Sequence, residues 1–209
     1  MDIVLLPGER LCGLGRRGFQ LIQMPGDDCF SQDSVLLADF ARAKPGQRVC
    51  DLAAGSGAVS VLLLAREPEI RCEMVEIRQD LCRRAERSAR LNGLSGRLAA
   101  HCLDLKQAAD HLGRGEFDLV VSNPPYHPVT GDAMAPGQRL ARQQLACDII
   151  ALAESACSLL RRHGRLCLCC PAGQVLMTAQ AMRQAGLEPK RLRFVAAFYD
   201  RAPYLCLME

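Results

Sequence analysis

The chain has 209 residues, a length typical of one domain, and its 49% hydrophobic and 23% charged content is that of a globular protein. Its formal net charge of +3 is too small to indicate nucleic-acid binding by itself. No run of 18 apolar residues is present and Asp2, Pro7 and Glu9 interrupt the start of the chain, so we expect neither a membrane span nor a secretory signal.

Twelve cysteines would suit a disulfide-rich protein, but their spacing does not. The Cys-x-x-Cys pair of Cys167 and Cys170 lies in an extended run, which would point the two thiols to opposite faces. We therefore expect reduced thiols, no metal site and a cytoplasmic location. Several cysteines fall inside apolar strand-like runs, where a thiol acts as a small hydrophobic group: Cys50, Cys72, Cys102, Cys167 and Cys169.

The elements follow a clear order along the chain. Residues 1–30 are glycine-rich and irregular, with strand-like pieces around residues 18–24, and we expect an N-terminal extension there. Ser31 or Asp33 is placed to cap a helix over the apolar run that starts at Val35. From residue 48 onward, strands and helices alternate. The predicted strands are 48–52, 70–77, 97–103, 117–122, 165–170, 191–198 and 204–208, and the predicted helices are 58–66, 79–92, 140–162 and 173–185.

This alternation predicts the fold class. Repeated strand–helix units demand an α/β, doubly wound, seven-stranded and mostly parallel sheet. The last two strands have no helix between them, only the turn-like residues 200–203. They are therefore expected to pair as an antiparallel hairpin at a sheet edge. No linker or internal repeat is visible, so we expect a single domain over residues 31–209.

A glycine-rich turn follows the first strand of the alternating series. It reads Asp-Leu-Ala-Ala-Gly-Ser-Gly from Asp51 to Gly57. Glycines there let a ligand approach the backbone, and the next helix offers its N-terminal N–H groups. Gly55, Gly57 and Ser60 come close to the fingerprint of dinucleotide-binding enzymes. This turn alone therefore does not separate a dinucleotide-binding enzyme from a protein that binds another ligand at the same place.

Acidic residues end the next two strands. Glu76 lies 25 positions after Asp51, where a carboxylate can accept hydrogen bonds from both hydroxyls of a ribose. Asp104 follows the third strand and suits an adenine amine. Because the carboxyl ends of parallel strands meet at one edge, these residues together favour a nucleoside ligand. Asp118 is expected to be structural.

Asn123, Pro124, Pro125 and Tyr126 directly follow the apolar strand 117–122. Proline fixes its own φ and biases the preceding residue toward extended geometry, so the Asn123 amide and the Pro124 carbonyl are held rigidly. Two fixed acceptors suit a planar –NH2 group, and Tyr126 adds a flat face for stacking. The motif predicts a pocket for an exocyclic amine such as adenine N6, or for a carboxamide such as glutamine. A nicotinamide dehydrogenase has no use for this loop.

Together these motifs resemble those of class I S-adenosylmethionine-dependent methyltransferases, in the branch that methylates amines. Residues 31–37 are similar to a segment upstream of the cofactor loop in the bacterial tRNA(Val) adenine-N6 methyltransferase family, and residues 188–193 resemble its C-terminal strand entry. The resemblance covers most of residues 18–209 and implies a Rossmann-like methyltransferase fold with S-adenosylmethionine as cofactor. In this family the residue matching Asp33 lies near the methionine part of the cofactor. The implied cofactor-binding residues are Asp33, Asp51, Ala53, Gly55, Gly57, Glu76, Ile77, Asp104, Leu105 and Asn123.

Two positions depart from the family pattern. Ala53 replaces the first glycine of the usual loop, a small change that we expect to be tolerated. His127 stands where the family often has another aromatic residue. It either stacks in the same way or marks a different substrate.

The resemblance implies adenine-N6 methylation of RNA, with tRNA as the expected partner. Asn123 and Pro124 would accept the two N6 hydrogens and Tyr126 would stack the base, which makes these three the predicted catalytic residues. The helix that carries Arg83, Arg84, Arg87 and Arg90 is interpreted as a solvated face. Predicted substrate-binding residues are Pro125, Tyr126, His127, Arg139, Arg142, Lys190 and Arg191, with Arg16, Arg17 and Arg193 as further basic candidates.

Three alternatives remain. The first is methylation of a glutamine amide in peptide-chain release factors, but that family usually carries a larger N-terminal helical domain. The second is DNA adenine methylation, which usually needs a separate DNA-recognition insertion. The third is a non-catalytic RNA-binding module that kept the fold; the intact Asn-Pro-Pro-Tyr motif and the acidic strand ends weigh against it.

Overall fold

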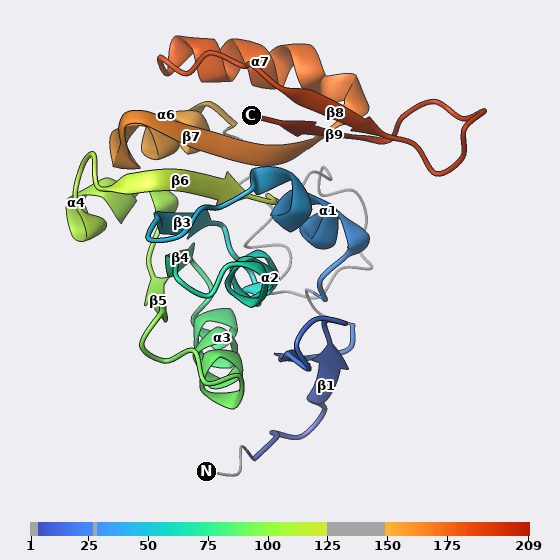
Figure 1. Cartoon of the computed structure of the whole chain (residues 1–209), viewed down its shortest axis with the longest axis vertical. Helices are drawn as coiled ribbons and strands as arrows, with labels where there is room; N and C mark the ends of the chain where they lie inside the picture. Colours follow the sequence, from blue (N-terminus) through green and yellow to red (C-terminus); the bar gives the residue numbers. More distant parts are fainter. Residues whose placement is uncertain (1–3, 27–28, 125–148) are drawn as a thin grey trace.

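The computed structural model describes residues 4–26, 29–124 and 149–209 (Figure 1). Seven strands form one sheet in the order β5-β4-β3-β6-β7-β9-β8. The first five in this order are parallel, and β9 is antiparallel to both of its neighbours. This confirms the predicted mostly parallel sheet with a C-terminal hairpin. The strands are β3 Arg48–Leu52, β4 Arg71–Glu76, β5 Leu98–Cys102, β6 Phe117–Ser122, β7 Leu160–Pro171, β8 Leu192–Val195 and β9 Leu205–Met208.

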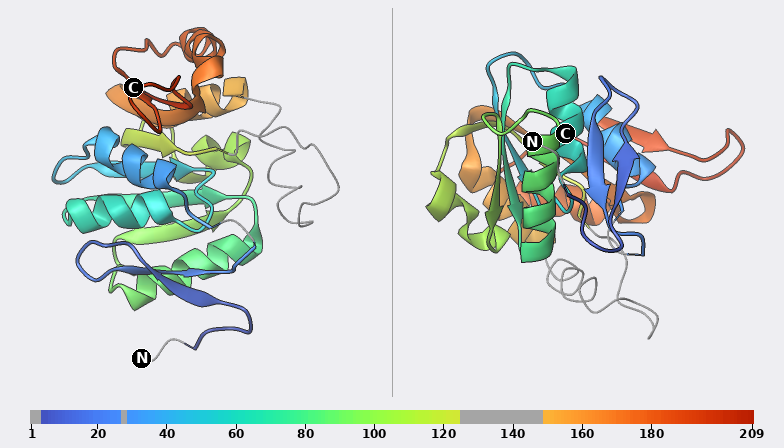
Figure 2. Two further views of the ribbon diagram at one scale, coloured as in Figure 1. Left: turned by 90° about the vertical axis from the view of Figure 1, so that its right-hand side faces the viewer. Right: turned by 90° about the horizontal axis from the view of Figure 1, so that it is seen from below.

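Helices cover both faces of the sheet (Figure 2). Helices α1 Gln32–Ala41, α2 Ala58–Arg66 and α3 Gln79–Leu91 pack on one face. Helices α4 Ala108–Leu112, α6 Ile149–Leu159 and α7 Val175–Gln184 pack on the other. Short 3₁₀ turns, η1 Leu105–Gln107 and η2 Ala172–Gln174, precede α4 and α7. None of the helices in the described ranges is both long and apolar enough to cross a membrane.

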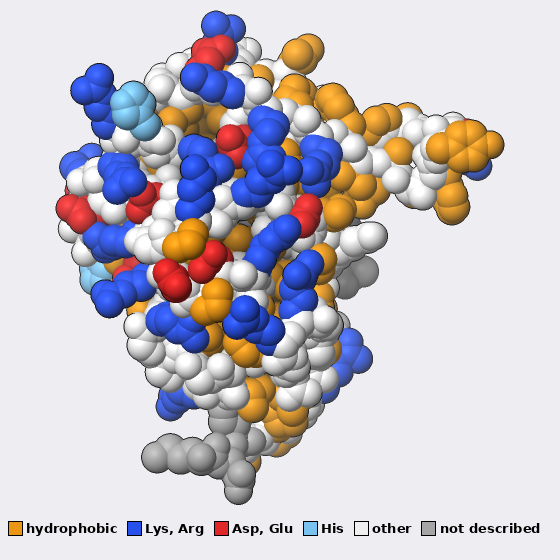
Figure 3. Space-filling model, in the orientation of Figure 1, with side chains coloured by type: hydrophobic (Ala, Val, Ile, Leu, Met, Phe, Trp, Pro, Cys, Tyr) orange, Lys and Arg blue, Asp and Glu red, His pale blue; other side chains and the backbone are white. Residues whose placement is uncertain are grey.

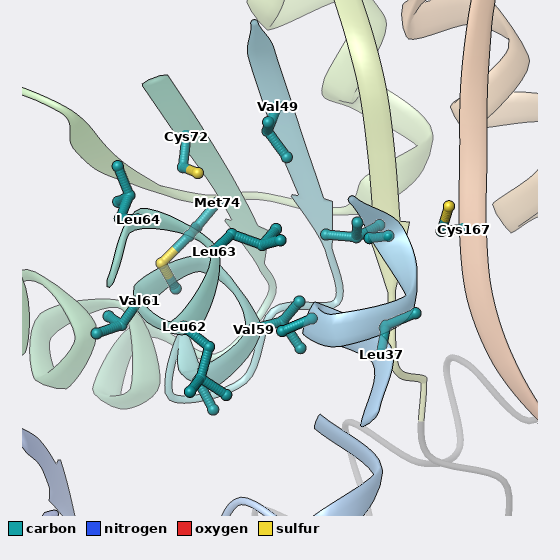
Figure 4. Close-up of a cluster of buried hydrophobic side chains, with 14 of the residues drawn as sticks. Leu37, Val49, Val59, Val61, Leu62, Leu63, Leu64, Cys72, Met74 and Cys167 are labelled. Atoms are coloured by element: carbon teal, nitrogen blue, oxygen red, sulfur yellow. The ribbon is translucent and has the colours of Figure 1, made fainter. Parts of the chain in front are cut away.

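The strands alternate between two hydrophobic cores, as a period of two requires. Cys167 packs with α1 and α2 in one core, and Cys170 packs with α6 and α7 in the other. The two thiols therefore point to opposite faces, as predicted. All six residues of β6 are buried, because helices cover both sides of this central strand. Figure 4 shows Val59, Leu63 and Met74 gathered between the central strands and α2.

The N-terminal segment forms a hairpin, β1 Arg10–Gly13 with β2 Gln20–Gln23, that packs on α3. Its backbone is tied to that helix: Ser88 Oγ accepts from the Ile22 N–H at 3.0 Å. Glu9 is buried between Arg84 and Arg87, and its Oε1 lies 2.7 Å from a guanidinium nitrogen of Arg87. The interpretation of this helix face as solvated was therefore wrong for these two arginines. They anchor the extension through a carboxylate some 75 positions away in the chain.

The predicted helix over 140–162 differs from the structure at its C-terminal end; residues 140–148 lie outside the described ranges. Helix α6 ends at Leu159, and β7 begins at Leu160, which pairs with Phe117. Gly164 packs so closely that an added Cβ would meet the Arg161 carbonyl at 2.9 Å and the Phe117 carbonyl at 3.0 Å. Pairing with β6 therefore overrides the helical tendency of this segment.

Candidate functional site

The site forms where the order of the sheet reverses. Strands β4 and β5 follow β3 in the sequence and lie on one side of it in the sheet, whereas the next strand, β6, lies on its other side. Leu52 and Ser122, the last residues of β3 and β6, are paired, and the Ser122 hydroxyl donates to the Leu52 carbonyl at 2.7 Å. The glycine-rich turn and Asn123 therefore start side by side, at the point where open α/β sheets bind ligands.

The turn after β3 has unusual backbone geometry. Ala53, Gly55 and Gly57 all have positive φ, at 55°, 58° and 81°. A side chain at Gly57 would be strained by this φ, and its Cβ would lie 2.8 Å from the sulfur of Met74, which would have to shift. Gly55 has nothing within 4 Å of its Cβ position, so its backbone is open to a ligand. Ala53 adopts the left-handed conformation that the usual glycine takes freely, at a cost on the order of 1 kcal/mol.

Glu76, at the end of β4, is buried against this turn. One carboxylate oxygen accepts from the Gly55 N–H and the other from the Arg78 N–H, both at 2.9 Å. The carboxylate thus holds the turn against the end of β4. Each of its oxygens has a second lone pair, so these bonds are compatible with the predicted contacts to ribose hydroxyls. Ile77 follows directly in the chain.

Asp51, in β3 just before the turn, is buried. Its Oδ2 accepts from the Ser60 N–H at 3.2 Å and from the Ser60 hydroxyl at 2.8 Å, which joins β3 to α2. Burial raises the pKa of Asp51 to about 7, and the nearby Glu76 carboxylate adds to this effect, while the Ser60 bonds oppose it. The observed role of Asp51 is thus to position the first turn of α2.

Asp104, after β5, begins the short helix η1. Its Oδ1 accepts from the Lys106 N–H at 2.9 Å, an N-terminal capping bond that orients the carboxylate. Leu105 next to it is half-buried and packs against the second core. Glu76 and Asp104 lie at the same edge because β4 and β5 are parallel, with Glu76 paired to Cys102.

Asn123 is oriented by a residue of α1. Its side-chain nitrogen Nδ2 donates to the hydroxyl of Ser34, which is buried, at 3.1 Å. Since the amide is planar, this bond turns Oδ1 away from Ser34. Pro124, the next residue, is buried. Asp33, beside Ser34 in the first turn of α1, lies near Tyr204, and partial burial together with this carboxylate raises the pKa of Tyr204.

Among the predicted substrate-binding residues, the structure gives clear contacts for Arg191. Arg191 precedes β8 and binds the Glu209 carboxylate and the Phe40 carbonyl, with its guanidinium 3.8 Å from the centre of the Phe40 ring. Phe40 is in the last turn of α1, roughly 10 Å along the helix from Ser34. These contacts place Arg191 beside the last turn of α1, and a role of Lys190 and Arg191 in substrate binding stays a prediction. Pro125, Tyr126, His127, Arg139 and Arg142 lie outside the described residues.

Three residues next to the predicted site residues were not themselves predicted to belong to the site. Ser34 and Ser60 bind the predicted site residues Asn123 and Asp51, and Tyr204 lies near Asp33. A short polar residue inside an apolar helical run is a weak signal for Ser34 and Ser60. No sequence signal pairs Tyr204 with Asp33.

The arrangement fits a nucleoside-containing cofactor. The open backbone at Gly55 and the N-terminus of α2 suit close approach of a ligand, and carboxylates at the ends of β4 and β5 suit ribose hydroxyls and an adenine amine. Asn123 borders the same space from β6. The site can thus hold a nucleoside next to a fixed amide acceptor.

Comparison with known proteins agrees with this geometry. The family model described as a methyltransferase small domain matches residues 27–184. The chain is 26% identical over 177 residues to a tRNA1(Val) (adenine(37)-N6)-methyltransferase of Parabacteroides distasonis, covering 85% of this chain and 74% of the relative. A relative of the same name from Citrobacter koseri is 25% identical over 201 residues, covering 93% and 82%. The fold is similar to that of a crystal structure described as a predicted O-methyltransferase from Agrobacterium tumefaciens, with a TM-score of 0.67, 20% identity and coverage of 84% and 78%.

Proposed function

Because this chain belongs to the methyltransferase small-domain family, we propose that it transfers a methyl group from S-adenosylmethionine to the N6 amine of an adenine in tRNA. The substrate follows the names of its relatives, and the site supplies the chemistry. A tRNA substrate agrees with a cytoplasmic location, as do the eleven cysteines in the described ranges, which are all free thiols.

The observation that carries the proposal is the hydrogen bond from Asn123 to Ser34 at the edge where β3 and β6 meet. It fixes which atom of the amide faces α1, which supports the proposal that Oδ1 recognises an N–H donor. The carbonyl of Pro124, locked by the proline ring, supplies the second acceptor. Two fixed acceptors match the two hydrogens of a planar amine.

The residues that would hold the cofactor follow the edge of the sheet. Glu76 and Asp104 would bind the ribose and the adenine, with Ile77 and Leu105 next to them in the chain. The turn at Gly55 would carry the part of the ligand closest to the backbone, and Asp33 would face its amino-acid end. When bound, S-adenosylmethionine supplies an electrophilic methyl carbon on sulfur.

The protein then contributes positioning and electrostatics. The adenine N6 lone pair is delocalised into the ring and is a poor nucleophile. By accepting both hydrogens, Asn123 and Pro124 aim that lone pair and stabilise the positive charge that grows on nitrogen. No strong base is required, because a positively charged N6 loses its proton readily to water. Tyr126, outside the described residues, is proposed to stack the base.

The test uses purified protein, S-adenosylmethionine with a deuterated methyl group, and two acceptors side by side: unmodified total tRNA and a peptide-chain release factor. Digested products are read by mass spectrometry, and labelled N6-methyladenosine in tRNA is the expected product. Labelled methylglutamine in the release factor, with no label in tRNA, would overturn the assignment of tRNA as substrate and leave the proposed site chemistry unchanged. No transfer to either acceptor, despite cofactor binding, would favour a non-catalytic module.

The variant Asn123→Ala tests the mechanism. It removes an acceptor that acts on the substrate amine, so we expect turnover to fall by about a hundredfold or more, while the dissociation constant for S-adenosylmethionine, measured by calorimetry, stays within about threefold. Unchanged turnover would exclude Asn123 from the reaction.

A further inference from the structure

The loop between β8 and β9 carries an unusual concentration of aromatic side chains. The chain has six phenylalanines, three tyrosines and no tryptophan, yet four of these rings lie within residues 194–204: Phe194, Phe198, Tyr199 and Tyr204. They are not core residues, because Tyr199 is fully exposed and Phe198 is 67% exposed. Figure 3 shows apolar side chains on this projecting hairpin, beside a face rich in lysine and arginine. Exposed rings contribute little to stability, so their concentration calls for a functional reason.

The hairpin extends from the edge of the sheet that carries the site. Ser122, at the end of β6, is level with Leu168, Met208 and Leu192 in the strand register. The last residue of β8, Val195, is three residues further on, which places it about 10 Å beyond that level. Residues 196–204 extend past it, away from the body of the protein (Figure 1).

The base of the hairpin is joined to the site itself. The Tyr204 side chain lies close enough to the Asp33 carboxylate for this charge to help raise the Tyr204 pKa, and Asp33 is in the same turn of α1 as Ser34, which orients Asn123. The Tyr204 N–H donates to the Val195 carbonyl at 2.9 Å and closes the base of the loop. The base of the hairpin is therefore held by a backbone bond and lies beside the first turn of α1.

The charges at the tip indicate what these rings contact. Asp200 and Arg201, both exposed, sit next to Tyr199 and cancel in net charge. A tip that bound phosphates would be basic, so the feature that stands out here is the flat apolar face of each ring. Nucleobases stack on such faces, and RNA is read mainly in loops whose bases are unstacked.

We propose that the hairpin of residues 194–204 docks the RNA substrate, with Phe198 and Tyr199 stacking on unpaired bases next to the target adenine. This rests on the proposed function, because the adenine must come from an RNA loop to reach Asn123. The narrow projection suits a nucleotide chain that passes along it. Arg193, half-exposed on β8 near the base of the hairpin, is paired with Asp39 at 3.3 Å, so the rings and not this cation carry the proposed contact.

The test compares the wild type, the double variant Phe198→Ser/Tyr199→Ser, the conservative variant Tyr199→Phe, and Leu11→Ser as a matched loss of an exposed apolar side chain from the other hairpin. Binding of unmodified tRNA is measured by fluorescence anisotropy at several salt concentrations. Cofactor affinity and melting temperature are measured in parallel. We expect the double variant to bind tRNA about tenfold to a hundredfold more weakly, the usual effect of losing base stacking.

The remaining readouts separate the explanations. The dependence of binding on salt should be the same in the double variant and the wild type, because no cation is removed. Tyr199→Phe and Leu11→Ser should bind as the wild type does. The proposal would be overturned if the double variant bound tRNA within twofold of the wild type. It would also be overturned if the double variant lost self-association and kept its RNA binding. Failure of the proposed function is distinguished from failure of this proposal by a separate result, namely that the wild type does not methylate tRNA.

Discussion

Asp51 offers a test of how the site is built into the core. Its carboxylate is buried beneath the glycine-rich turn, and burial raises its pKa from 3.8 to about 7. Between these two values the folded protein holds a proton that the unfolded chain has lost. Stability contributed by this group therefore falls as pH rises from about 4 to about 7, and the full penalty is present above pH 7.

The variant Asp51→Asn removes this titration. A shift of about 3 pKa units at about 1.4 kcal/mol per unit corresponds to a penalty of up to about 4 kcal/mol in the wild type at pH 8. The asparagine still accepts from Ser60, and any loss from its buried amide nitrogen is the same at every pH. The difference in free energy of unfolding, variant minus wild type, should therefore increase steadily from pH 4 to pH 8.

Urea denaturation of the cofactor-free protein at pH 4, 5, 6, 7 and 8 measures this difference. Asp200→Asn is the control, because Asp200 is exposed at the tip of the C-terminal hairpin and its replacement should leave the profile unchanged. A difference between Asp51→Asn and wild type that stays constant within about 0.5 kcal/mol over this range would refute the reasoning.

Three further substitutions test the site. Ser34→Ala removes the hydrogen bond that orients Asn123, worth about 0.5–1.5 kcal/mol, so kcat should fall about twofold to tenfold with unchanged cofactor affinity; a change confined to KM would contradict a positioning role. Ala53→Gly relieves the left-handed backbone at Ala53 and should raise the melting temperature by about 1–4 °C in calorimetry, whereas a lower value would show that the turn carries no strain there. Gly57→Ala should lower the melting temperature in the same experiment, because alanine is strained at a φ of 81° and its Cβ would displace the end of Met74; an unchanged value would contradict both costs.

The pattern of the sequence was sufficient to predict the fold and to predict that the site lies at the carboxyl ends of the parallel strands. Strands buried on both faces read as continuous apolar runs, and the alternation with helices leaves few arrangements other than a doubly wound sheet. The acidic residues and Asn123 end successive strands, so the topology of parallel strands places them at one edge without knowledge of any contact.

The tertiary structure decided the partners of these residues. Ser34 and Asn123 are 89 positions apart, and only the packing of α1 against α2, β7 and β9 brings them together. In the same way, Arg84 and Arg87 were interpreted as solvated and are bound by Glu9 of the N-terminal hairpin. Arg191 was predicted to bind substrate and is bound by Glu209. The end of α6 at Leu159 depends on pairing of the next residue with Phe117. Local pattern encodes how a segment folds and which face it buries, whereas pairing between charged and polar groups depends on distances that the chain alone does not specify.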